Sequence, residues 1–153
     1  MKTVAIQITR VLLLALVALS LGAWGMRTFA RQHVDSASQT QLPSDGLIVV
    51  NFHGATRCNS CIEIGKVAQT VVETDFTDAL RSGRLKWSVI NFEEPTSRHF
   101  IKDYGIVSST VVLVRREHGK DIEFRRLDAV WDHLFDNPAM KSYLRNEITA
   151  LKP

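Results

Sequence analysis

From residue 47 onward, hydrophobic residues gather in short runs, and these runs predict strands. Residues 47–52 and 110–115 are almost continuously apolar, which is typical of strands buried on both faces of a sheet. Residues 85–92 have a similar composition and predict a third strand. Residues 121–127 alternate weakly and predict an edge strand, reached through a hairpin turn at residues 117–120.

Between these runs, apolar residues recur at three- and four-residue steps, which predicts helices. The longest helix is expected from residue 58 to about residue 82, and a shorter one from residue 93 to residue 104. A last helix should begin with Asn137 as its N-cap and Pro138 in its first position. Strands that alternate with helices indicate a partly parallel sheet, so we expect an α/β domain with helices on both faces.

The N-terminal segment has a different pattern. Lys2 and Arg10 precede an uncharged run at residues 11–26 dominated by Leu, Val and Ala. A basic start followed by an apolar run predicts a signal peptide or a signal-anchor helix over residues 1–30, either cleaved after Ala30 or retained in the membrane. The basic end of such a segment is expected to stay on the cytoplasmic side of the membrane. The chain that follows the apolar run is then expected in an extracytoplasmic, periplasm-like compartment.

Residues 31–45 are polar and predict a linker, which leaves residues 46–153 as the folded domain. The formal net charge of +3 arises entirely before residue 44. From there to the end, 15 basic residues balance 15 acidic ones. The domain therefore carries no excess of positive charge, and we expect no nucleic acid partner.

The candidate chemistry lies in Cys58-Asn59-Ser60-Cys61, the only two cysteines of the chain, between a predicted buried strand and a predicted helix. This spacing at a helix start brings both sulfurs to one side, within reach of a disulfide. The helix N-terminus and the neighbouring Arg57 favour a thiolate at Cys58, which is expected to be the nucleophile. Cys61, one turn further, is expected to be the resolving thiol.

Two other interpretations of the cysteines remain open. A purely structural disulfide gains little here, since it closes a loop of only four residues. A copper or zinc carrier would use both thiolates with His53. A closed structural zinc site is not expected, because the sequence has no second cysteine pair and no two histidines at the required spacing after the first pair. No organic cofactor is implied. Arg125 and Arg126 are expected to face solvent and guard an edge strand.

At this point residues 47–151 resemble the thioredoxin superfamily. The resemblance rests on VVNF at residues 49–52, VINFEEP at residues 89–95, DYGI at residues 103–106, and the HGK turn before a final amphipathic helix. It implies a thioredoxin-like three-layer fold. The segment FHGATRCNSC is also similar to a smaller group, the ArsF-type subunits of nitrophenyl-compound nitroreductases.

The sequence departs from the thioredoxin pattern at several positions. Asn51 stands where thioredoxins have a buried acid, and Arg57 where they have a tryptophan. Ser109 or Thr110 occupies the place of the cis-proline that faces the sulfurs, so a trans bond is expected there. An amide cannot accept a proton as a carboxylate does, which puts general thioredoxin activity in doubt.

The sequence therefore predicts an extracytoplasmic thiol–disulfide oxidoreductase or electron-transfer module, held in the membrane by its N-terminal helix or exported. Its partner would be a protein that carries a disulfide or a dithiol. The competing hypotheses are the metal carrier and a non-catalytic interaction domain that keeps the fold and a passive disulfide.

Overall fold

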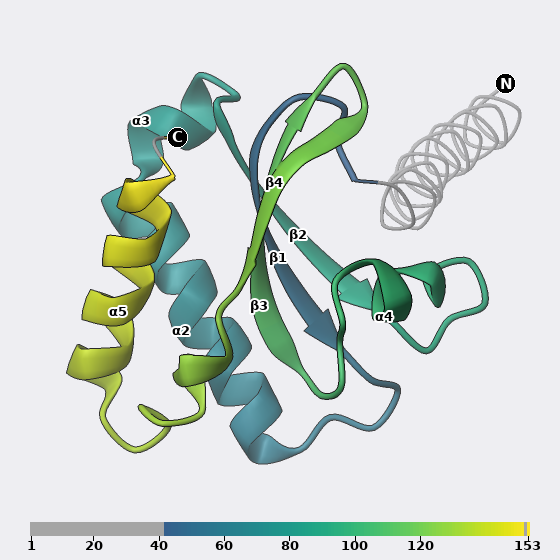
Figure 1. The fold of residues 1–153 in the computed structure, drawn as a ribbon. Coiled ribbons are helices and arrows are strands. Elements are labelled where there is room, and N and C mark those ends of the chain that lie inside the picture. Colours follow the sequence, from purple (N-terminus) through teal and green to yellow (C-terminus); the bar gives the residue numbers. More distant parts are fainter. Residues whose placement is uncertain (1–41, 152) are drawn as a thin grey trace, which may run out of the picture. The chain divides into compact units, whose positions relative to one another are not determined.

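A mixed four-stranded sheet forms the centre of the domain in the computed structural model, which describes residues 42–151 and 153 (Figure 1). The strands are β1 Gly46–His53, β2 Leu85–Asn91, β3 Thr110–Glu117 and β4 Lys120–Arg126. Their order across the sheet is β2-β1-β3-β4. β1 runs parallel to β2 and antiparallel to β3, and β4 pairs antiparallel with β3.

Helices cover both faces of this sheet, as expected. α2 Asn59–Asp75 and α5 Asn137–Ala150 lie against one face, and the short α4 His99–Asp103 lies against the other (Figure 1). A further short helix, α3 Thr77–Arg81, follows α2, and one 3-10 turn, η1 Asp128–Val130, follows β4. The predicted α/β class, with a partly parallel sheet between helices, is confirmed.

The alternation of side chains along β1 explains why its sequence is continuously apolar. Leu47 and Val49 point into the core beneath α2 and α5, whereas Ile48, Val50 and Phe52 point into the core beneath α4. Residues in both sets are almost fully buried. A central strand with two covered faces has no solvent side, and no polar alternation is needed.

The predicted long helix is broken in two, which corrects the expectation of one helix to residue 82. α2 ends at Asp75, and Phe76 leaves helical geometry with φ −122° and ψ 27°. The Thr77 hydroxyl donates to the Glu73 carbonyl at 2.7 Å and to the Thr74 carbonyl at 3.4 Å. These side-chain bonds take up acceptors of the last turn of α2, so the chain stops there and restarts as α3.

Two other helix starts differ from the prediction. The N-cap of α5 is Asp136, not Asn137, because the Asp136 carboxylate accepts from the Ala139 backbone N–H at 2.9 Å. The Asn137 amide instead donates to the Glu63 carboxylate on α2 at 3.2 Å. α4 begins only at His99, since the residues after β2 form turns instead of a first helical turn.

The hairpin between β3 and β4 turns at His118 and Gly119, both with positive φ (51° and 77°). Positive φ at both central positions is what a tight hairpin with strongly twisted strands requires. The segment that enters the domain is fastened to this turn. The Gly119 N–H donates to the Ser44 carbonyl at 2.9 Å, and the His118 N–H donates to Asp45 at 2.7 Å.

Arg116 adds a second connection to the entering segment. Its guanidinium donates to the carbonyls of Leu42 and Pro43 at 2.7 and 2.9 Å, and it pairs with Asp121 at 2.7 Å. Arg116 is paired with the first residue of β1, Gly46, in the strand register. The chain therefore enters at the end of β1 that is opposite to the end leading to the cysteines.

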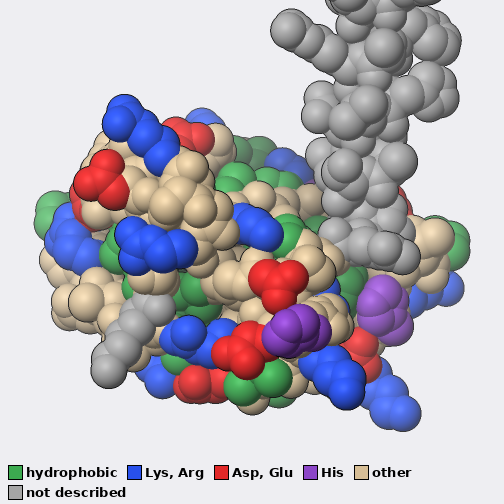
Figure 2. All heavy atoms as spheres, turned by 90° about the horizontal axis from the view of Figure 1, so that it is seen from above, with side chains coloured by type: hydrophobic (Ala, Val, Ile, Leu, Met, Phe, Trp, Pro, Cys, Tyr) green, Lys and Arg blue, Asp and Glu red, His purple; other side chains and the backbone are tan. Residues whose placement is uncertain are grey.

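The predicted signal or anchor segment, residues 1–30, and residues 31–41 of the predicted linker lie outside the described residues. Among residues 42–151 and 153, no helix has the length and apolar character needed to span a membrane. Seen from above, basic and acidic side chains are interspersed on the face that the view presents (Figure 2). That face of the domain has no single dominant charge.

Candidate functional site

The loop that leads from β1 to the cysteines is shaped by a close contact with the turn after β2. Gly54 follows β1, and a side chain there would place its Cβ 2.8 Å from a carboxylate oxygen of Glu93. The other oxygen of Glu93 accepts from the Ala55 backbone N–H at 3.0 Å. The absence of a side chain at Gly54 lets the Glu93 carboxylate come close to the loop backbone; a side chain there would require the carboxylate to shift.

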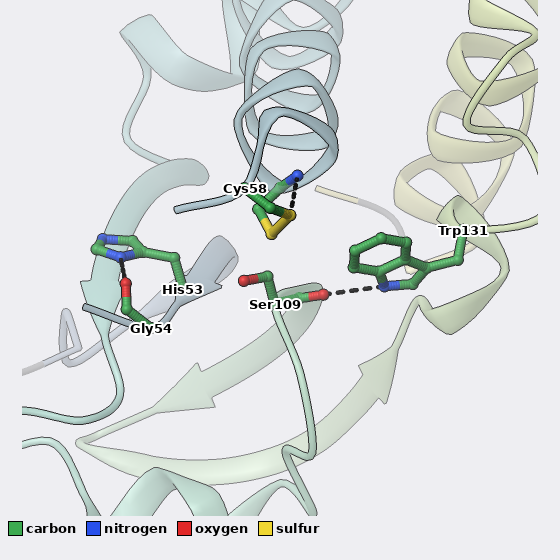
Figure 3. The surroundings of a disulfide bond; sticks show 6 residues. His53, Gly54, Cys58, Ser109 and Trp131 are labelled. Atoms are coloured by element: carbon green, nitrogen blue, oxygen red, sulfur yellow. Dashed lines mark hydrogen bonds between the residues drawn. A yellow bond between two sulfur atoms is a disulfide. The ribbon is translucent and has the colours of Figure 1, made fainter. Parts of the chain in front are cut away.

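Cys58 and Cys61 form a disulfide at the start of α2, with their Cα atoms 5.1 Å apart (Figure 3). Cys58 is the N-cap of the helix, and its sulfur accepts from the Cys61 backbone N–H at 3.1 Å. Cys58 is exposed, whereas Cys61 is partly shielded. The helix N–H groups and the helix dipole would stabilise negative charge on the sulfur of Cys58 once the bond is reduced.

Ser109 faces the disulfide from the loop before β3. Its side chain lies next to the sulfur pair, with the hydroxyl turned to the side of His53 (Figure 3). The hydroxyl of Thr110 instead bonds to the Asp128 carboxylate at 3.2 Å. Of the two residues that the sequence left open, Ser109 therefore lies opposite the sulfurs. The described residues contain no cis peptide bond.

The loop that carries Ser109 is held from two sides. The indole N–H of Trp131 donates to the Ser109 carbonyl at 3.0 Å (Figure 3). The guanidinium of Arg126 donates to the Gly105 carbonyl and pairs with Asp128 at 2.6 Å. Ser109 is thereby fixed at 8% exposure beside the disulfide.

These contacts correct the expectation that Arg125 and Arg126 merely face solvent. Arg126 fastens the loop of the candidate site, and Arg125 binds Glu147 of α5 at 2.7 Å. The interpretation from sequence also missed the contact of Trp131. A partly buried indole N–H needs an acceptor, which is the one signal that pointed to a polar contact there. No sequence signal assigned Arg126 to the loop.

His53 ends β1, and its imidazole extends to the side away from the sulfurs (Figure 3). Its Nδ1 lies 2.8 Å from the Gly54 carbonyl oxygen. Burial lowers the pKa of His53, and the nearby Arg57 lowers that pKa further. Among the described residues, no three His, Cys, Asp or Glu side chains lie close enough together to hold a metal ion.

Asn51 lies beneath the first turns of α2, on the same face of β1 as Leu47 and Val49. It is 6% exposed, and its amide packs against Gly65. A Cβ at Gly65 would lie 3.3 Å from the Asn51 Cγ and still closer to Nδ2. Asn51 and Cys61 line the same small cavity, so the amide lies on the side of the site where thioredoxins have their buried acid.

The chain matches no family model, and no match was found among curated proteins. The candidate site is therefore identified from the geometry of its residues alone. An exposed cysteine stands at a helix N-terminus, a partly shielded cysteine is bonded to it, and Ser109 lies opposite the pair.

Proposed function

We propose that this protein is a thioredoxin-like thiol–disulfide oxidoreductase or electron-transfer module that works through Cys58 and Cys61. The observation that carries the proposal is the asymmetry of the pair. Cys58 is exposed at the N-cap of α2 and Cys61 is partly shielded, although the two sulfurs are bonded to each other. A purely structural bridge needs no such difference, and one that closes so short a loop adds little stability.

The exchange runs in two balanced steps. The thiolate of reduced Cys58 attacks one sulfur of a partner disulfide, which forms a mixed disulfide and releases the other partner sulfur as a thiolate. The sulfur of Cys61, after loss of its proton to water, attacks the sulfur of Cys58. The second partner thiolate leaves, and the Cys58–Cys61 disulfide is restored. The partner gains two electrons and two protons, and the reverse sequence oxidises a partner dithiol.

The strand order and the helices support a thioredoxin-like fold as part of this proposal. A buried parallel strand leads into the cysteine pair, and an antiparallel hairpin completes the sheet. Asn51 and Ser109 depart from the thioredoxin pattern on both sides of the sulfurs. We therefore expect a restricted set of partners instead of general activity on protein disulfides.

The proposal places the domain outside the cytoplasm, where a dithiol can be held oxidised. It rests on the basic start and the apolar run of residues 11–26. A reporter enzyme fused after Pro153 should be active only outside the cytoplasm. Activity confined to the cytoplasm would overturn this location.

Redox titration of the full chain in neutral detergent tests the activity. Trapping of free thiols across a series of glutathione buffers should give one reversible two-electron transition. Cys61→Ser should accumulate a mixed disulfide with a partner, and Cys58→Ser should not. In the reduced protein Cys58 should alkylate before Cys61, and Arg57→Ala should slow that alkylation. A bridge that resists reduction until the domain unfolds would instead indicate a structural disulfide.

A further inference from the structure

A small cavity of about 190 Å³ opens beside the disulfide, between α2 and the edge strand β2. Cys61 and Asn51 lie within it, and the wall on the sheet side is formed by Trp87 and Val89. The other residues that line it are His53, Arg57, Ile62, Gly65, Lys66 and Gln69. We call this cavity the α2–β2 groove.

The charged side chains that line the α2–β2 groove are positive. None of its lining residues is Asp or Glu, whereas Arg57 and Lys66 contribute two full positive charges. Both side chains are exposed, and neither makes a hydrogen bond or an ion pair with another described residue. Arg116 and Arg126, by contrast, are paired with carboxylates. Two unpaired cations beside a reactive sulfur are therefore a distinct feature of this site.

The acidic groups around the groove do not line it. Glu93 accepts from the Ala55 backbone N–H, and Glu94 also lies outside the lining. On α2, Glu63 accepts from the Asn137 amide, and Glu73 accepts from the amide of the lining residue Gln69 at 2.8 Å, but neither glutamate lines the groove itself. Anionic groups would therefore be attracted to the groove.

We infer that the α2–β2 groove selects partners whose reacting sulfur is flanked by a carboxylate. While the partner sulfur meets Cys58, the carboxylate enters the groove and pairs with Arg57 and Lys66. The inference rests on the proposed function and adds the substrate class to it. The carboxylate can belong to a small acidic disulfide or to an Asp or Glu beside a cysteine of a partner protein.

Rates of exchange with disulfides of different charge test the inference. The reduced full chain, in neutral detergent, reacts with an anionic, a neutral and a cationic small disulfide: dithiodipropionate, hydroxyethyl disulfide and cystamine. Each rate is divided by the rate of the same disulfide with a free monothiol, which removes intrinsic reactivity. We expect the normalised anionic rate to exceed the cationic one by about threefold to tenfold at low salt, and the excess to shrink at high salt.

Charge variants locate the effect. Lys66→Gln should reduce the anionic preference, and Lys66→Glu, whose carboxylate balances the charge of Arg57, should abolish it. Lys102→Gln is the matched control, because Lys102 is an exposed lysine on α4, on the opposite face of the sheet. Equal normalised rates for all three disulfides, or equal effects of the Lys66 and Lys102 variants, would overturn the inference and leave the proposed function standing. No exchange with any disulfide would overturn both.

Short cysteine peptides, supplied as mixed disulfides, distinguish the two sources of the carboxylate. Peptides with Glu, Gln or Lys next to the cysteine are compared in the same assay. A preference for Glu that exceeds the preference among the small disulfides supports an acidic protein segment as the partner. A preference of the same size in both series supports a low-molecular-weight acidic disulfide. A preference for Lys would contradict the inference.

Discussion

Replacing Gly65 by Ala should destabilise the domain only while Asn51 is present. In a helix interior, this change alone favours folding by about 1 kcal/mol, since it removes the backbone entropy of glycine. In this chain the new Cβ would lie 3.3 Å from the Asn51 Cγ and closer to its Nδ2. Asn51 is 6% exposed and short, so the amide has little room to move away.

Forcing a methyl group into a packed site costs about 1–3 kcal/mol. With a cost of about 2 kcal/mol, Gly65→Ala should lower the free energy of unfolding by about 1 kcal/mol. In the Asn51→Ala background the obstacle is gone, and the same change should raise that free energy by about 1 kcal/mol. The coupling energy between the two positions is then about 2 kcal/mol, which is large enough to measure.

Urea unfolding of the four oxidised proteins of this double-mutant cycle, followed by tryptophan fluorescence, gives the coupling directly. Each single variant serves as the reference for the other. If Gly65→Ala stabilised the domain equally with and without Asn51, the close packing of amide and glycine would be refuted. The glycine would then have to be explained in another way.

Three further changes test other contacts. Asp136→Ala should lower the free energy of unfolding by about 1 kcal/mol, because it removes the N-cap of α5. Asn137→Ala should lower it by a smaller amount. A larger decrease for Asn137→Ala in urea unfolding would show that Asn137 is the N-cap. Burial and the hydrogen bond to Asp121 raise the pKa of Tyr104 above its value in the unfolded chain. Stability from this group is complete below about pH 10 and is lost as pH rises beyond it, so Tyr104→Phe should flatten the decline of unfolding free energy with alkaline pH. A decline as steep as that of the parent protein would contradict this. His53→Ala should leave dithiol–disulfide cycling within about twofold, because the imidazole extends away from the sulfurs; loss of stoichiometric bound copper or zinc in this variant would favour the carrier.

The strands and turns whose signals lie within a few consecutive residues were predicted correctly. The apolar run of residues 47–52 identifies β1, and the His118-Gly119 pair identifies the hairpin, since buried strands and tight turns have local signatures. The break of the helix at Phe76 was not predicted. The apolar periodicity continues through that point, and only the hydroxyl of Thr77 marks it.

In the candidate site, too, the features set by local sequence were predicted and those set by residues distant in sequence were not. The position of Cys58 and Cys61 at a helix start follows from their spacing and from the strand before them. Whether Ser109 or Thr110 faces the sulfurs does not follow from sequence, since it depends on which carbonyl Trp131 binds and which hydroxyl Asp128 binds. These partners lie 22 and 18 residues away, beyond the reach of any local pattern.

The fastening of residues 42–45 to the hairpin has a practical consequence for attaching the protein to a surface. The entering segment is bound at one end of β1, and the reactive sulfurs follow the other end. A strand of that length spans roughly 25 Å. Immobilisation on a bead or an electrode through residues that precede Leu42 should therefore keep the disulfide accessible to soluble reagents. Attachment through Ile62, which borders the sulfurs on α2, should block them.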